Sequence, residues 1–431
     1  MIIVIGGGPA GRMAALRLAG AGKEVTILEK RSLGGQCVHD GCMLICGLND
    51  VARSIRNAAF LQERGVVAGG LTVCYPEIMR RMEEVQAKLA HILEKETIAA
   101  GVKIEYGTEA EVRDGKVFVN GEPREAEQII IAAGAQMNIP DVPGADLKGT
   151  YTARSIKQMP SLPKRLAIIG GGIAAAEFAY IYSAFGSEVF IIARSELLSV
   201  LPAPLQKDAR RDLADVHILE HAKLERIEGA GHVAAVVVSG ETIPCDAVLF
   251  AAGMKPESPF VSGVAKRPDG AIIVDEHMET SVKGIYACGD VIGAPYFTPV
   301  ARLRGFAAAD AILGRPRKID LAQVPFAVVL GLDYTVCPAV GSGKTFGSPN
   351  IAGPESFWHV ADGSVGHMYL SVKDDDGKIL GFATSGPATG VVGTYLGYLV
   401  RKGVTVHEFS PMLEVHPVAD GLYSLIRFQE K

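Results

Sequence analysis

A strand–turn–helix–strand pattern occurs twice along this chain of 431 residues, and it limits the fold more than any other feature. In the first copy, the apolar run Ile2–Ile5 leads into a glycine-rich turn at residues 6–11. In the second copy, the apolar run 166–169 leads into a similar turn at residues 170–175. Both turns fit the pattern G-x-G-x-x-G/A, whose small residues permit a tight turn, close approach of a pyrophosphate and close helix–sheet packing. The repeat therefore predicts an α/β protein with two Rossmann-like dinucleotide-binding domains.

The two copies differ where a bound nucleotide would place its ribose. Glu29 follows Gly6 by 23 residues, and a carboxylate at this point accepts hydrogen bonds from both ribose hydroxyls of an adenosine. The same step from Gly170 reaches Ala193 and then Arg194, and an arginine there accommodates a 2′-phosphate. The sequence thus predicts FAD at the first site and NADPH at the second. NADH stays an alternative, because Arg194 is equally typical of a solvated strand end.

Composition excludes several classes of protein. The formal net charge is −5 with Lys and Arg dispersed, which argues against a dedicated nucleic-acid binder. The first apolar run ends at Gly6, so it is too short for a signal peptide or a membrane span. Seven scattered cysteines are not typical of a secreted disulfide scaffold. We therefore expect a cytoplasmic protein with no nucleic-acid and no membrane partner.

Two cysteines, Cys37 and Cys42, stand just beyond the first βαβ unit. On a regular helix their spacing gives a rise of about 7.5 Å, beyond the usual Cα separation of a disulfide. A disulfide here needs a distorted turn, which Gly41 permits. Cys42 would then begin a helix, where the helix dipole favours a thiolate. A zinc site is the rival interpretation, although no second Cys/His pair at ligand spacing accompanies it, and we predict no metal.

With these motifs in order, the chain resembles the class I FAD-dependent pyridine nucleotide–disulfide oxidoreductases, the group of dihydrolipoamide dehydrogenase, glutathione reductase and mercuric reductase. The first turn with Glu29 and the cysteine segment 35–42 match two motifs of that family. The segments 170–177, 285–290 and 298–301 match three more, and His416-Pro417 matches the motif near its C-terminus.

The resemblance implies a glutathione reductase-like arrangement of domains. An FAD-binding domain would comprise residues 1–150 and 255–316, and an NAD(P)H-binding domain would comprise residues 151–254. Residues 317–431 would form an α+β interface domain that makes the protein a homodimer.

The resemblance also implies a role for individual residues. Cys37 would attack the substrate, Cys42 would contact the flavin, and Glu177 would lie beside the nicotinamide and the flavin. His416 from the partner subunit would act as acid/base, with Asp420 as its candidate orienting group. The expected cofactor contacts are Gly6, Gly8, Pro9, Ala10, Gly11, Glu29, Lys30, Gly35, Gln36, Ala133, Gly134, Gly170, Gly172, Ala175, Arg194, Gly253, Gly289, Asp290, Thr298 and Ala301.

The chain departs from the family pattern at three points. Where the family has a Lys that pairs with the glutamate by the flavin, this chain has Cys46, so Glu177 lacks an obvious partner. Where the family has a Glu that orients the histidine, this chain has Gly421, with Asp420 one residue earlier. Cys46 also lies one helical turn beyond Cys42, either as a packing residue or as a third redox thiol.

The predicted activity is electron transfer from NAD(P)H through FAD and the Cys37–Cys42 disulfide to a small disulfide substrate, or the reverse oxidation of a dithiol. Two alternatives stay open. One is different reductive chemistry at the reduced thiols within the same family, and the other is an electron-transfer subunit of a larger redox complex.

Overall fold

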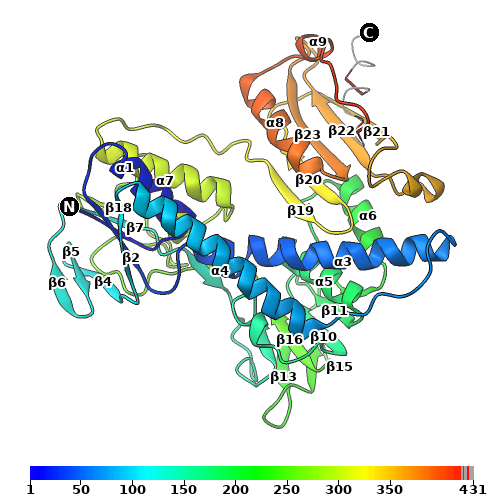
Figure 1. Cartoon of the computed structure of the whole chain (residues 1–431), viewed down its shortest axis with the longest axis horizontal. Helices are drawn as coiled ribbons and strands as arrows, with labels where there is room; N and C mark the ends of the chain where they lie inside the picture. Colours follow the sequence, from blue (N-terminus) through cyan, green and yellow to red (C-terminus); the bar gives the residue numbers. More distant parts are fainter. Residues whose placement is uncertain (419–420, 422–424, 427–431) are drawn as a thin grey trace.

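The computed structural model describes the chain except for residues 419–420, 422–424 and 427–431. A five-stranded parallel sheet in the order β18-β7-β1-β2-β3 lies on the left of Figure 1. The inner strands β7 and β1 are mainly apolar and buried, as expected where helices cover both faces of a parallel sheet. The elements of this part are β1 (Ile2–Ile5), α1 (Pro9–Ala19), β2 (Val25–Glu29), β3 (Lys103–Tyr106), β7 (Gln128–Ile131), β18 (Ile285–Ala287) and α7 (Thr298–Ile312).

The segment between β2 and β3 is helical and carries the two cysteines. It consists of α2 (Gly35–His39), the long helix α3 (Cys42–Glu63) and α4 (Tyr75–Ala99). In Figure 1, α3 runs away from the first sheet and beneath the C-terminal strands. A small antiparallel sheet beside β3 is formed by β4 (Ala110–Arg113), β5 (Lys116–Val119) and β6 (Glu122–Arg124).

A second five-stranded parallel sheet repeats the first, in the order β12-β11-β10-β16-β9. Its elements are β9 (Thr150–Thr152), η1 (Ile156–Gln158), β10 (Arg165–Ile169), α5 (Ile173–Phe185), β11 (Glu188–Ile192), α6 (Ala203–Asp212), β12 (Val216–Leu219) and β16 (Ala247–Phe250). An antiparallel sheet joins it, formed by β13 (Leu224–Glu228), β14 (Ala235–Val238) and β15 (Glu241–Pro244). The antiparallel pair β8 (Ala135–Met137) and β17 (Met254–Pro256) lies where the chain passes between the two units.

The C-terminal part is an antiparallel sheet of five strands in the order β19-β20-β23-β22-β21. Its strands are β19 (Phe326–Val329), β20 (Asp333–Cys337), β21 (Lys344–Pro349), β22 (His367–Val372) and β23 (Ile379–Gly386). Its helices are η3 (Trp358–Asp362), α8 (Thr389–Lys402) and α9 (Val406–Phe409). Together with the two parallel sheets, this α+β unit confirms the predicted fold class.

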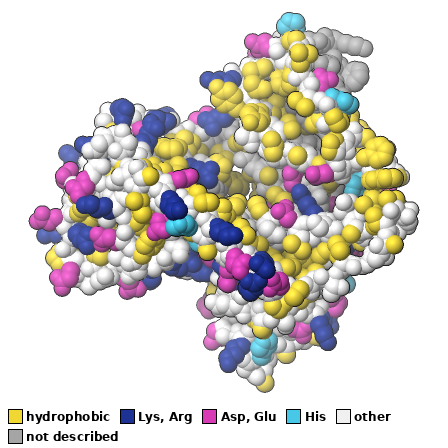
Figure 2. All heavy atoms as spheres, in the orientation of Figure 1, with side chains coloured by type: hydrophobic (Ala, Val, Ile, Leu, Met, Phe, Trp, Pro, Cys, Tyr) yellow, Lys and Arg dark blue, Asp and Glu magenta, His cyan; other side chains and the backbone are white. Residues whose placement is uncertain are grey.

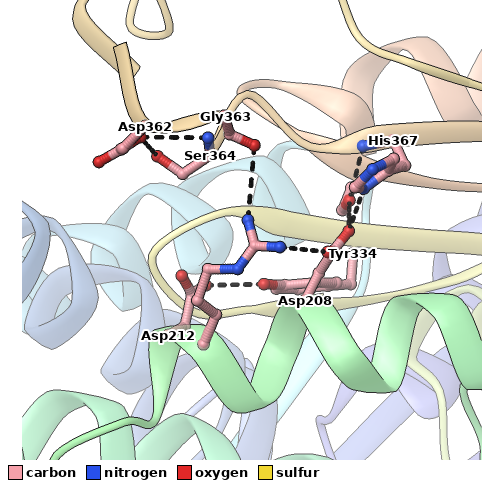
Figure 3. Close-up of polar contacts among 9 residues, drawn as sticks. Asp208, Asp212, Tyr334, Asp362, Gly363, Ser364 and His367 are labelled. Carbon is pink, nitrogen blue, oxygen red and sulfur yellow. Dashed lines mark hydrogen bonds and ion pairs between the residues drawn. The ribbon is translucent and has the colours of Figure 1, made fainter. Parts of the chain in front are cut away.

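Helix α6 holds the second sheet against the C-terminal sheet through buried polar contacts (Figure 3). A carboxylate oxygen of Asp212 accepts 2.9 Å hydrogen bonds from the backbone N–H of Leu332 and the hydroxyl of Tyr334. Asp208 lies 2.7 Å from Nδ1 of His367 and accepts a hydrogen bond from the Ser385 hydroxyl. Burial raises the pKa of Asp212 to about 6. These contacts fix the turn between β19 and β20, which also touches the cysteine helix.

No helix in the described part of the chain is long and apolar enough to cross a lipid bilayer.

Candidate functional site

The cysteine pair lies at a break between two helices. Helix α2 ends at His39, and α3 begins at Cys42 after the turn at Asp40 and Gly41. A Cβ atom at Gly41 would lie 3.2 Å from the carbonyl oxygen of Gln36, so the turn requires a close approach that favours glycine. The chain thus departs from a regular helix between the cysteines, as a pairing of the two sulfurs requires.

The hydroxyl of Thr298, at the start of α7, lies between the two thiols. Its Oγ1 is 3.4 Å from Sγ of Cys37 and 3.5 Å from Sγ of Cys42, and both cysteines are free thiols. Residues from two distant segments therefore meet at one candidate site. The sequence assigned Thr298 to the flavin edge, but the contact with both sulfurs appears only in the fold.

The two thiols differ in acidity because they form a hydrogen bond with each other. That bond, together with the Thr298 hydroxyl and the positive charge of Arg302, lowers the pKa of Cys37 to about 6. Conversely, the bond to Cys37 and then burial raise the pKa of Cys42. The sequence favoured a thiolate on Cys42 because this residue begins a helix. In the reduced pair, the interaction between the two sulfurs favours a thiolate on Cys37.

Glu177 lies on the interior side of the site without a cation. Its Oε1 accepts a 3.1 Å hydrogen bond from the backbone N–H of Val329 in β19, and only 8% of the residue is exposed. Among the described residues, no Lys, Arg or His forms an ion pair with it. Burial therefore raises the pKa of Glu177 to about 8, so the carboxyl group is largely protonated at neutral pH. Burial also raises the pKa of Cys46, and the charges of Cys42, Asp50, Glu177 and Asp333 add to this effect.

The glycines of the first turn prevent clashes and leave room for a pyrophosphate. A Cβ on Gly6 would lie 2.5 Å from the carbonyl oxygen of Ala132, and one on Gly11 would lie 2.0 Å from that of Gly6. A Cβ on Gly8 would meet no atom closer than Cα of Gly35, which lies 3.9 Å away, so the space beside Gly8 is open. At the end of β2, the Glu29 carboxylate accepts a 2.7 Å hydrogen bond from the Gly7 backbone N–H. Pro9 and Ala10 begin α1, and Lys30 is exposed in an ion pair with Glu109.

Asp290 supports a bound group at this site because one of its oxygens is buried without a partner. Its Oδ1 has no hydrogen bond within the protein, and burial raises the pKa of the carboxyl to about 6. Beneath it, buried Arg304 donates hydrogen bonds to the carbonyl oxygens of Gly289, Gly293 and Ala294. The residues present thus fit a group with hydroxyls and a pyrophosphate, such as FAD. The sequence analysis did not identify Arg304 as a residue of this site. Its position among the buried apolar residues of α7 could have indicated a role.

The other residues predicted to bind FAD surround the same turn. Gly35 and Gln36 lie in α2, Thr298 and Ala301 lie in α7, Gly289 begins the 3₁₀ helix η2 (Gly289–Ile292), and Ala133 and Gly134 follow β7. A Cβ on Gly289 would lie 2.7 Å from that of Ala10.

The turn of the second unit has similar geometry. A Cβ on Gly170 would lie 2.2 Å from the carbonyl oxygen of Ala251, whereas no atom lies within 4 Å of a Cβ on Gly172. Ala175 is buried in the first turn of α5, and Gly253 follows β16. Arg194 follows β11 with its side chain exposed.

Of the predicted acid/base His416 and its predicted orienting residue Asp420, the structure describes only the histidine. His416 is exposed, and no hydrogen bond joins it to either redox cysteine within the described part of one chain. Asp420 lies outside the described residues. As for a metal, no group of three or more His, Cys, Asp or Glu side chains placed to hold one is found among the described residues.

Comparisons with known proteins identify the family. Residues 1–305 match the family described as pyridine nucleotide-disulphide oxidoreductase. The chain belongs to this family. It is therefore an oxidoreductase of an FAD-dependent family, which confirms the resemblance seen in its motifs.

Individual relatives match nearly the whole chain. Dihydrolipoyl dehydrogenase of Geobacillus stearothermophilus is 28% identical over 96% of this chain and 93% of its own. Mercuric reductase of Shigella flexneri is 27% identical over 96% of this chain and 77% of its own. The solved structure of the HOCl-induced flavoprotein disulfide reductase RclA from Escherichia coli covers both chains fully, with a TM-score of 0.87 and 23% identity. That structural match supports the fold.

Proposed function

We propose that this protein transfers electrons from NAD(P)H through FAD and the Cys37–Cys42 pair to a small disulfide. The observation that carries the proposal is the contact of Thr298 with both sulfurs at the start of α7. This contact places the cysteine pair beside the segment that follows Asp290, whose buried oxygen lacks a partner within the protein. When bound, FAD would supply a two-electron carrier between the nicotinamide, which donates a hydride, and the Cys37–Cys42 disulfide, which is reduced.

The two cysteines divide the thiol chemistry. Cys37, with its lowered pKa, attacks one sulfur of the substrate disulfide as a thiolate and releases the first product thiol. Cys42 then gives up its proton and attacks Sγ of Cys37, which releases the second product thiol and restores the Cys37–Cys42 disulfide. A full cycle consumes one NAD(P)H, one proton and one disulfide, and yields NAD(P)⁺ and two thiols.

Proton transfer to the leaving thiol is assigned to His416 of the partner subunit, with Asp420 as its proposed orienting group. Within one chain this histidine is exposed, which suits a residue that completes a neighbouring site. Exposed apolar side chains of the same C-terminal part support a homodimer, among them Val391, Tyr395 and Tyr398 of α8. Figure 2 displays hydrophobic side chains gathered over this part and over α3, whereas charges of both signs are interspersed near α1 and α7.

For the nicotinamide cofactor we propose NADPH rather than NADH. Arg194 supports this choice because it is exposed after β11, close to the strand end where a 2′-phosphate would lie. The proposed domain limits follow the same scheme, with residues 1–150 and 255–316 binding FAD, residues 151–254 binding NAD(P)H and residues 317–431 forming the interface.

A second candidate is other reductive chemistry at the reduced thiols. Glu177 without a cation and Cys46 one turn beyond Cys42 favour it, because both depart from the family pattern at the redox site. The absence of turnover with every member of a disulfide panel, despite normal reduction of the flavin by NADPH, would favour this candidate.

Anaerobic titration of the purified holoenzyme with NADPH and with NADH tests the proposal. We expect stronger reduction by NADPH than by NADH. We also expect a long-wavelength charge-transfer band when Cys42, beside the flavin, passes its proton to Cys37 and its thiolate contacts the flavin, and we expect loss of this band in Cys42→Ser. A disulfide-substrate panel would follow. Absence of the band in the wild type, or its persistence in Cys42→Ser, would contradict the proposal.

A further inference from the structure

We infer that the substrate carries a negative charge near its reacting sulfur, and that Arg302 receives this charge while Cys37 attacks. The inference deepens the proposed function and rests on it. It assigns a specificity-determining residue outside the motifs discussed above.

The position of Arg302 follows from the helix that bears it. Thr298, the first residue of α7, contacts both redox sulfurs, and Arg302 follows it by one helical turn on the same face. The side chain of Arg302 is exposed, and no ion pair or hydrogen bond occupies its guanidinium among the described residues. Its positive charge nevertheless reaches Sγ of Cys37, where it stabilises the thiolate.

Three other arginines near this helix are already occupied. Arg304 binds three backbone carbonyl oxygens, whereas Arg17 and Arg317 both pair with the buried carboxylate of Asp310. Arg302 is therefore a cation beside the nucleophile whose donors are available. A guanidinium presents paired donors that match the two oxygens of a carboxylate or phosphate.

The charges around the two ends of the site favour an anion at Cys37. The charged side chain that lowers the pKa of Cys37 is Arg302, and no carboxylate contributes to its main shifts. One turn along α3, desolvation and then the negative charges of Asp50 and Asp333 raise the pKa of Cys46. Helices α3 and α7 also both begin at the cysteine pair without a side-chain cap, so their positive ends add to the field. A carboxylate or phosphate is thus attracted to Cys37 and repelled from Cys46.

Two alkylating reagents of equal size and different charge test this inference without a known substrate. Iodoacetate is an anion and iodoacetamide is neutral, and mass spectrometry gives the alkylation rate of Cys37 in holoenzyme reduced by dithiothreitol. In Arg302→Gln we expect the ratio of the iodoacetate rate to the iodoacetamide rate to fall about two- to fivefold. Arg302→Lys should retain most of the ratio, since it keeps the charge.

Arg315→Gln is the matched control, because this exposed arginine lies just beyond the other end of α7 and its loss changes net charge equally. Its ratio at Cys37 should equal that of the wild type, and Cys46 within Arg302→Gln gives an internal reference whose ratio stays constant. Equal slowing of both reagents in Arg302→Gln would overturn the inference, since Arg302 would then act on ionisation alone. An unchanged ratio would overturn it as well.

Turnover distinguishes failure of the inference from failure of the proposed function. With NADPH, we expect Arg302→Gln to raise KM for the dianion dithiobis(nitrobenzoate) about two- to fivefold, and to leave KM for neutral hydroxyethyl disulfide nearly unchanged. Equal effects on both disulfides would contradict the inference alone. Absence of turnover with both in the wild type would contradict the proposed function, while the alkylation ratio would still test Arg302.

Discussion

The two sides of the redox site have opposite electrostatic character. On the Cys37 side, formed by Cys37, Thr298 and Arg302, a cation and two helix starts stabilise negative charge, and the pKa of Cys37 falls to about 6. On the Cys46 side, formed by Cys46 and Glu177, desolvation without a cation raises the pKa of both groups, with Glu177 buried and the Cys46 side chain still exposed to solvent. Thiols within ten residues of each other thus differ in acidity because of their neighbours.

Replacing a cysteine on each side should change kcat by very different amounts, and this is the largest difference that we expect between the two sides. We expect Cys37→Ser to lower kcat for disulfide reduction by at least about a thousandfold, because it removes the attacking thiolate. Cys46→Ser should keep kcat within about twofold, since Cys46 is a poor thiolate at neutral pH. Steady-state kinetics with NADPH and a disulfide substrate measure both. A comparable loss in Cys46→Ser would assign this thiol a redox role and break the distinction between the sides.

The Cys46 side should make stability depend on pH through Glu177. Its pKa of about 8 in the folded protein exceeds its ordinary value of 4.5, so the folded state keeps a proton that the unfolded chain releases. As pH rises between these values, the folded state loses about 1.4 kcal/mol of stability per pH unit from this group. Thermal unfolding of wild type and Glu177→Gln should therefore give Tm values that diverge from pH 5 to pH 8, with the variant higher at pH 8.

Cys46→Lys offers a matched test of the same cause. A lysine at this position would bring a positive charge to the side of α3 that faces Glu177, and should lower the pKa of the carboxyl. The fall in Tm that Glu177 causes in the wild type between pH 5 and pH 8 should therefore be reduced in Cys46→Lys, as it is in Glu177→Gln. A Tm difference from wild type that stays constant with pH in both variants would mean that Glu177 is ionised in the folded protein.

The pH dependence of alkylation compares the two thiols directly. In reduced holoenzyme, the iodoacetamide rate at Cys37 should be half-maximal near pH 6 and reach a plateau above pH 7. The rate at Cys46 should still rise at pH 9, because its pKa is raised. At pH 7 we expect Cys37 to react at least about tenfold faster than Cys46. Coincident profiles would remove the distinction.

Thr298→Val should have the smallest effect. Valine keeps the shape of the side chain but removes the hydroxyl that contacts both sulfurs, so the pKa of Cys37 should rise. One hydrogen bond of about 0.5–1.5 kcal/mol corresponds to a two- to tenfold lower alkylation rate at pH 6. Thr298→Ser should retain the wild-type rate, and a loss of rate in it equal to that of Thr298→Val would show that shape rather than hydrogen bonding matters.

Local patterns predicted the fold and the location of the cysteines. The glycines at 6–11 and 170–175 are required by contacts within each turn, so their spacing carried the information. The apolar residues of α4 recur at the helical period, so this helix also follows from a local pattern. The break before Cys42 was likewise visible from its glycine.

Contacts between distant segments could not be predicted from the sequence. Val329 bonds to Glu177 although the two residues are 152 positions apart, and Thr298 reaches Cys37 from 261 positions away. The acidity of the two thiols depends on these contacts and on the interaction between the sulfurs, so helix position alone does not determine it. Arg302 was overlooked for the same reason, since its partner is brought close only by the fold.

Thiol labelling before and after NADPH addition tests the central claim most directly. Air-oxidised holoenzyme would be treated anaerobically with NADPH, denatured and alkylated, and each cysteine quantified by mass spectrometry. We predict that Cys37 and Cys42 are both protected before NADPH and both alkylated after it, whereas Cys46 is alkylated in both samples. Alkylation of Cys37 and Cys42 in the oxidised enzyme, or their continued protection after NADPH, would contradict the claim that electrons pass through this pair.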